Sequence, residues 1–92
     1  MEGFFELRTD RLMDKKELAA LCKALRGMKN LTQGDVADRI ASTRGEAVSK
    51  QSISLAENPD YAGMESLRIE IVELLSGRKL SGPYWKFEEV QA

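Results

Sequence analysis

The 92-residue sequence predicts a small all-α domain of four to five helices, because apolar side chains recur at helical spacing in four segments. The residues that flank these segments support the prediction. Asp14, Thr32 and Ser49 are good helix N-caps, and Pro59 and Gly77 stand where helices are expected to end. The composition, 42% hydrophobic and 32% charged, is that of a globular domain rather than of a disordered chain.

The first helix is expected to begin between Thr9 and Asp14 and to end between Gly27 and Asn30. Asp14 and Glu17 have the spacing of a capping box, in which each side chain accepts a hydrogen bond from the backbone of the other residue. The apolar stripe of this helix consists of Leu18, Leu21, Cys22, Leu25 and Met28.

The second helix is expected to start at Thr32, with Asp35 in its first turn, and to be two to three turns long. Its small apolar face consists of Val36, Ala37 and Ile40. Residues 41–47 carry no helical stripe, and Gly45 among small polar residues favours a loop. The alternative is that part of this segment continues the second helix.

The third helix is expected to run from Ser49 to Asn58, where Pro59 stops it. Ile53 and Ala56 form its inner stripe. Its outer face is polar and consists of Lys50, Gln51 and Ser54.

The fourth helix is expected to span about Gly63 to Ser76. One apolar stripe consists of Met64, Leu67, Ile71, Leu74 and Leu75. Ile69 and Val72 add a second apolar side, which predicts that a partner subunit covers it.

The sequence divides into an N-terminal arm (1–9), a helical domain (10–77) and a C-terminal tail (78–92). The tail starts as a linker, and its partial alternation of apolar and polar residues over 84–90 allows a short strand. Its aromatic side chains either fold back on their own core or cross to a second subunit, and residues 4–7 are a candidate partner strand. Dimerisation is favoured because the fourth helix has a second apolar side beyond the one expected to face its own core. The candidate dimer interface is therefore Ile69, Val72, Tyr84, Trp85 and Phe87.

The formal net charge of −1 argues mildly against nucleic-acid binding, for which a strongly basic domain is usual. The charges are unevenly distributed, however. Between Cys22 and Asn58 there are six basic and four acidic residues, so this segment carries +2 and the rest of the chain −3. This distribution allows a basic patch on an acidic body.

Enzyme classes find no support in the residue types present. The sequence has no histidine, which is the commonest general base near neutral pH, and its single cysteine, Cys22, provides neither a usual zinc site nor an intramolecular disulfide. There is no phosphate-binding loop or nucleophile-elbow motif. We therefore expect no catalytic residue, cofactor or metal. We also expect a cytoplasmic protein, since no signal peptide or membrane-spanning run is seen.

Two short helices joined by a turn, the second with a polar outer face, are typical of a helix-turn-helix. The run Leu31–Ile40 reads LTQGDVADRI, and the run Val48–Asn58 reads VSKQSISLAEN. Together they resemble the lambda-repressor/Cro-like (Xre-type) helix-turn-helix family, over about Leu18 to Leu75. Two features depart from the family pattern: seven residues, 41–47, stand where about two are usual, and Pro59 replaces a glycine.

The resemblance implies a set of DNA contacts. Gln33 would bond a phosphate at the start of the second helix, where free amides and the helix dipole attract anions. Lys50 and Gln51 would face the bases, since lysine suits guanine and glutamine suits adenine. Arg44, in the enlarged loop, would be a free basic side chain, either solvated or in contact with DNA, whereas Glu57 is expected to be structural. The whole DNA-binding set is Gln33, Arg44, Ser49, Lys50, Gln51, Ser52, Ser54 and Asn58.

The function that the resemblance implies is a sequence-specific transcriptional regulator that binds double-stranded DNA. We expect a homodimeric repressor on a palindromic operator, of the kind that mobile elements such as phages and plasmids carry and that often regulates its own operon. The alternative is an antitoxin or another protein-interaction module that uses the same fold, with the aromatic tail as its partner-binding segment.

Overall fold

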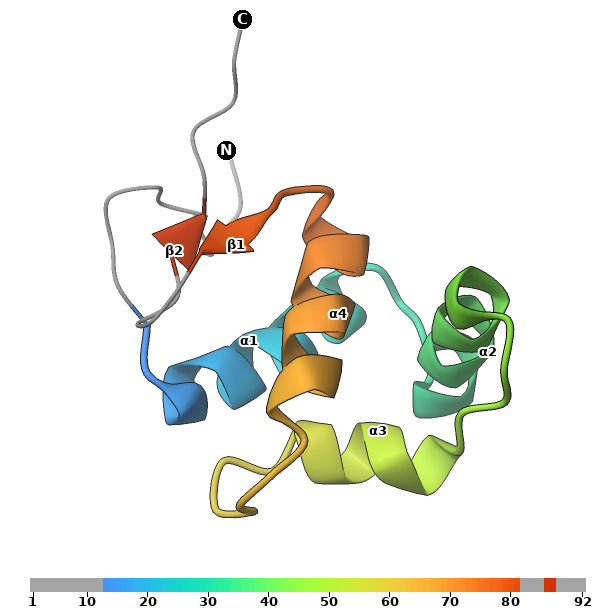
Figure 1. The fold of residues 1–92 in the computed structure, drawn as a ribbon, viewed down its shortest axis with the longest axis horizontal. Coiled ribbons are helices and arrows are strands. Elements are labelled where there is room, and N and C mark those ends of the chain that lie inside the picture. The colour runs from blue at the N-terminus through green and yellow to red at the C-terminus, as the bar shows by residue number, and fades with distance from the viewer. Residues whose placement is uncertain (1–12, 82–85, 88–92) are drawn as a thin grey trace, which may run out of the picture.

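A computed structural model describes residues 13–81 and, for the backbone alone, residues 86–87. These residues form a mainly helical domain, which confirms the predicted all-α class (Figure 1). The elements are α1 (Lys15–Met28), α2 (Gln33–Arg44), α3 (Lys50–Ala56), α4 (Glu65–Ser76), β1 (Leu80–Ser81) and β2 (Lys86–Phe87).

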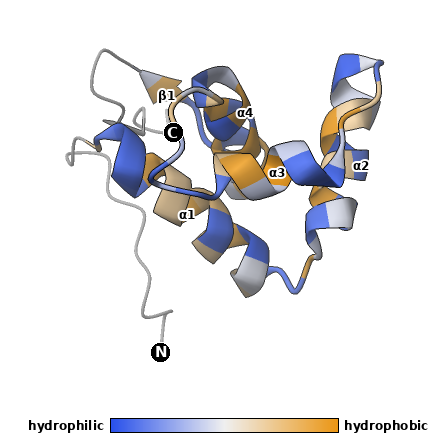
Figure 2. Cartoon of the chain, turned by 90° about the horizontal axis from the view of Figure 1, so that it is seen from below, coloured by the Kyte–Doolittle hydropathy of each residue, from blue (hydrophilic) through white to orange (hydrophobic). Residues whose placement is uncertain are grey.

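The core lies where α4 packs against α1, and α2 lies to one side of this pair and α3 below it (Figure 1). Leu18 of α1, Ile53 of α3 and Ile71 of α4 are completely buried. Ile40 of α2 is only 1% exposed. Figure 2 shows that α3 is hydrophilic where it begins beside α2 and hydrophobic toward its end. All four helices therefore contribute to one hydrophobic core.

Each of the first three helices begins at the cap that the sequence predicts. Asp14 and Thr32 form capping boxes with Glu17 and Asp35, and the amides of these partners donate to the cap side chains over 2.8 and 3.0 Å. Ser49 caps α3 by accepting from the amide of Ser52 over 3.0 Å. These caps fix where the chain enters each helix.

The enlarged segment 41–47 is in part helical. Helix α2 continues through Arg44, and Gly45 then ends it with φ +80°, a left-handed conformation that glycine adopts without strain. Four of the seven residues 41–47 thus form the last turn of α2, and the connection to α3 is short. Of the two alternatives for this segment, continuation of the second helix is correct as far as Arg44.

In the tail, β1 and β2 pair as antiparallel strands, with Leu80 opposite Phe87 and Ser81 opposite Lys86. The expectation that residues 78–83 are only a linker is wrong for Leu80 and Ser81. The amide of Leu80 also donates to Glu73 Oε2 over 2.9 Å, which ties β1 to the end of α4. The predicted arm (1–9), the candidate strand at residues 4–7, and Tyr84 and Trp85 lie outside the described residues.

The second apolar side of α4 does not face outward as predicted. Val72 is fully buried and belongs to the hydrophobic core of its own chain. The assignment of Val72 to a dimer interface is therefore wrong. Ile69 is half-buried against the same core. Among the described residues, no helix combines the length and the apolar character that crossing a bilayer requires.

Candidate nucleic-acid interface

Helix α3 has one buried face and one exposed polar face. Ile53 and Ala56 are fully buried, whereas Lys50, Gln51 and Ser54 are exposed. This division follows from the helical period, since the buried residues lie three apart and the exposed ones fall on the other side. The polar face that the sequence predicts for base reading is therefore at the surface.

The start of α2 lies beside the start of α3. A shallow surface hollow is lined by Arg26, Leu31, Thr32, Gln33, Gly34 and Lys50. The first backbone hydrogen bond of α2 comes from the amide of Val36, so the amides of Gln33 and Gly34 precede the helical ladder. The hollow therefore combines a helix N-terminus with the ammonium group of Lys50, and both favour an anion.

A network of polar groups joins α1, α2 and the end of α3. Arg26 donates to both carboxylate oxygens of Glu57, over 2.5 and 3.0 Å, and to the carbonyl of Leu31 over 3.0 Å. The hydrogen bond from Arg26 holds the pKa of its guanidinium above the ordinary value. Gln33 donates from Nε2 to Glu57 Oε1 over 3.1 Å. Glu57, whose side chain is only 5% exposed, thus has the structural role that the sequence predicts.

Gln33 lines the hollow and has a hydrogen-bond partner within the protein. One hydrogen of its amide group is directed to Glu57, at the rim of the hollow. Its contact with phosphate remains a prediction.

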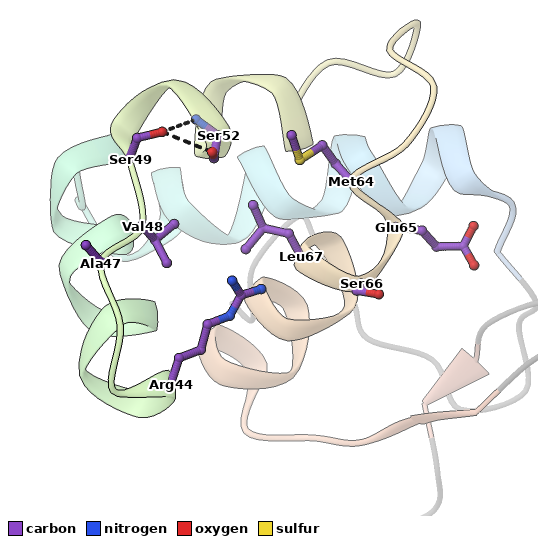
Figure 3. Close-up of a pocket in the computed structure, with 9 residues that line it drawn as sticks. All are labelled: Arg44, Ala47, Val48, Ser49, Ser52, Met64, Glu65, Ser66 and Leu67. Carbon is purple, nitrogen blue, oxygen red and sulfur yellow. Dashed lines mark hydrogen bonds between the residues drawn. The ribbon is translucent and has the colours of Figure 1, made fainter.

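Arg44 is not the free basic side chain that the sequence predicts. It ends α2 and extends toward α4 beside a second hollow, which Figure 3 shows with Ser49, Ser52 and the start of α4. Its guanidinium contacts both oxygens of Glu70, over 2.5 to 3.0 Å. This hydrogen bonding raises the pKa of Arg44, and the positive charge is balanced within the protein. The expectation fails because Glu70 lies 26 residues away in the sequence.

Three of the predicted contact residues take part in local hydrogen bonds. The Ser49 and Ser52 hydroxyls lie 3.0 Å apart at the α3 cap (Figure 3). Asn58 accepts from the amide of Asp60 through Oδ1, over 3.0 Å, and so shapes the turn after α3. These bonds give each side chain a role in the fold, and their contacts with DNA stay predictions.

Arg68 is the polar residue near the site that sequence reasoning missed. It is fully buried and donates to three backbone carbonyls at the end of α3, those of Ala56, Asn58 and Tyr61, each over 2.8 Å. A signal was present, because Arg68 stands four residues after Met64 and three before Ile71, on the apolar stripe of α4. A charged residue on such a stripe needs buried partners.

Comparisons of the chain with family models, curated proteins and solved structures find no match. Residues 13–81 contain no group of three or more histidine, cysteine or acidic side chains placed to hold a metal ion. Burial raises the pKa of the Cys22 thiol to about 12, so this group is a poor nucleophile at neutral pH. What the site offers is hydrogen bonding and positive charge on an exposed helix.

Proposed function

We propose that the protein is a sequence-specific DNA-binding regulator of transcription, with α2 and α3 acting as a helix-turn-helix of the lambda-repressor/Cro-like type. One observation carries the proposal: the exposed polar face of α3 adjoins the N-terminus of α2, and the opposite face of α3 is buried. A reading helix needs this combination, because it must reach base edges while the helix behind it prevents rotation.

The proposed division of labour follows the chemistry of each group. Gln51, Lys50 and Ser54 read base edges in the major groove. The N-terminal amides of α2, with Gln33 at their side, bind a phosphate and set the register on the duplex. Glu57 keeps away from the DNA, since it faces Arg26 and Gln33.

We further propose that the protein acts as a homodimeric repressor on a palindromic operator and that it represses its own operon, as such regulators often do. The candidate interface is then Ile69 with the tail residues Tyr84, Trp85 and Phe87, without Val72. Two copies related by a two-fold axis would place their reading helices about one turn of DNA apart, roughly 34 Å.

The experiment is fluorescence anisotropy on a 20-bp duplex that the protein has enriched from a random library. We expect Gln51→Ala to lose most of the preference for this duplex over a scrambled one, by about tenfold, since a bidentate contact is worth about 1–3 kcal/mol. Lys50→Ala should weaken binding and lower the salt dependence, whereas Lys16→Ala, which removes an exposed lysine from α1, should not.

Two results contradict the proposal. If the protein enriches no sequence, or if Gln51→Ala discriminates as well as the wild type, α3 does not read DNA. A protein-interaction role, such as that of an antitoxin, would then replace it, and the test would move to partners of the tail.

A further inference from the structure

Two charged side chains are buried among residues 13–81, Glu57 and Arg68, and the proposed DNA contacts use neither. Glu57 is paired with Arg26. Arg68 instead directs its guanidinium at backbone carbonyls, and this arrangement needs an explanation because a buried charge is costly unless its donors and its charge are both satisfied.

The carbonyls that Arg68 meets lie where α3 ends. Nε donates to Ala56, in the last turn of α3, and Nη2 donates to Asn58 and Tyr61 in the following turn. The carbonyl end of a helix carries a partial negative charge, so a cation is stabilised there. Arg68 thus caps α3 with a side chain that comes from a different helix, α4.

Helix α3 depends on such anchors because it is short. It has seven residues, of which only Ile53 and Ala56 are buried, and a helix of this length is not stable alone. Its first residue follows a connection whose Glu46 and Ala47 are exposed. Its last turn, in contrast, is held from α1 by the Arg26–Glu57 pair and from α4 by Arg68.

We propose that Arg68 is a positioning residue for DNA reading, which fixes the orientation of α3 by holding its C-terminal end against α4. This inference rests on the proposed function. Base contacts require the reading side chains to be placed within about 0.5 Å, whereas attraction to phosphates tolerates larger displacements. Loss of Arg68 should therefore reduce discrimination between sequences more than it reduces general affinity for DNA.

The test compares Arg68→Met with Ile71→Val, a core variant of the same helix that keeps the Arg68 bonds. Both are measured at a temperature where circular dichroism shows them folded, on the enriched 20-bp duplex and on a scrambled duplex. We expect Arg68→Met to lose about tenfold in discrimination, with affinity for the scrambled duplex and its salt dependence unchanged within twofold. For Ile71→Val, the ratio of the affinities for the enriched and the scrambled duplex should stay within twofold of the wild-type ratio.

Arg68→Lys provides a second variant if Arg68→Met does not fold. It keeps the charge, but a single ammonium nitrogen does not reproduce the spread of the guanidinium donors, so we expect an intermediate loss of discrimination. If both variants discriminate as well as Ile71→Val, the proposal is overturned.

Amide hydrogen exchange, measured without DNA, separates this inference from the proposed function. Arg68→Met should lower the protection of α3 amides at least tenfold more than that of α1 amides. Unchanged protection of α3 would overturn the anchoring role, whatever the DNA result. A third outcome is that the wild type enriches no duplex while α3 still loses protection in Arg68→Met. In that case Arg68 anchors α3, but the proposed DNA function and the positioning role in DNA reading are both rejected.

Discussion

The α1–α4 pair and helix α3 are stabilised in different ways. Helices α1 and α4 each bury five residues, nearly all of them apolar, and they make the most extensive helix–helix contact in the described part of the chain. Helix α3 buries two and is held at its ends by a serine cap, a carboxylate and a buried arginine. The scaffold thus depends on hydrophobic burial, and the proposed reading helix depends on hydrogen bonds.

The difference teaches how a small domain can present a polar helix. A helix that must expose most of its surface to a ligand has little apolar area left for the core. Directional hydrogen bonds at its termini then supply the missing constraint, and they also fix its orientation more narrowly than apolar packing does. Substitutions in the two regions should differ in size and in kind.

The largest effect is expected in the scaffold. Leu18→Ala, at a fully buried position of α1, should lower the free energy of unfolding by about 3 kcal/mol, from lost burial and the cavity left behind. Leu55→Ala, at a half-buried position of α3, should lower it by about 1 kcal/mol. Urea denaturation measures both values, and equal losses would contradict the contrast between the two regions.

The second largest loss of stability is expected when the carboxylate charge at the end of α3 is removed. Glu57→Gln should destabilise the protein by about 2 kcal/mol, because Arg26 keeps its charge in a partly buried place without a counterion. Glu46→Gln, in the exposed connection, is the matched control and should stay within about 0.5 kcal/mol of the wild type. Identical urea midpoints for the two variants would show that the pair contributes nothing.

The pH dependence of stability tests whether the core excludes water from the Cys22 thiol. Burial raises the pKa of Cys22 from 9.0 to about 12, so its neutral form is favoured in the folded state. The stabilisation is complete below pH 9 and is lost as the pH rises from 9 toward 12, since only the unfolded chain then releases the proton. Relative to Cys22→Ala, the wild type should lose up to about 1.4 kcal/mol per pH unit in that range.

The measurement for Cys22 is a series of urea unfolding curves between pH 8 and pH 10.5 on both proteins. Parallel pH profiles would mean that the thiol ionises as easily in the folded protein as in the unfolded one. Rapid reaction of the native protein with a thiol reagent at pH 8 would lead to the same conclusion.

The smallest effect on stability is expected at the exposed Arg44–Glu70 pair. Glu70→Gln should cost at most about 0.5 kcal/mol, because both side chains are about one-third exposed and solvent and salt screen the attraction. Glu70→Gln is expected to strengthen DNA binding, because Arg44 then becomes available to contact a phosphate. The slope of log affinity against log salt concentration should become steeper by about one released ion. A salt dependence equal to that of the wild type would place Arg44 away from the DNA.

Much of the fold was predictable because its determinants are local. The caps Asp14, Thr32 and Ser49 and the apolar stripes are set by residues within one or two turns, and they place the helices correctly. The buried side of α3 follows from the same periodicity. The exposed polar face at Lys50, Gln51 and Ser54 could therefore be predicted from the sequence, and its contact with DNA stays a proposal.

The errors lie where distant segments decide the outcome. Val72 was expected to face a partner, but the packing of the helices buries it in the core of its own chain. Arg44 was expected to be free, but the fold brings Glu70 to it. The position of Arg68 on the apolar stripe of α4 indicated that it is buried, but its acceptors could not be predicted, because they are backbone carbonyls, which every residue has.

The extra turn of α2 has a consequence for how such a protein can change. Since the Arg26–Glu57 pair and Arg68 hold the C-terminal end of α3, we expect residues added between α2 and α3 to leave the orientation of α3 unchanged. Lengthening a loop costs little in closure entropy, about 0.6 kcal/mol for each doubling. We therefore expect the exposed connection after Gly45 to accept an insertion, or a grafted fluorescent or affinity label, with the polar face of α3 left in place.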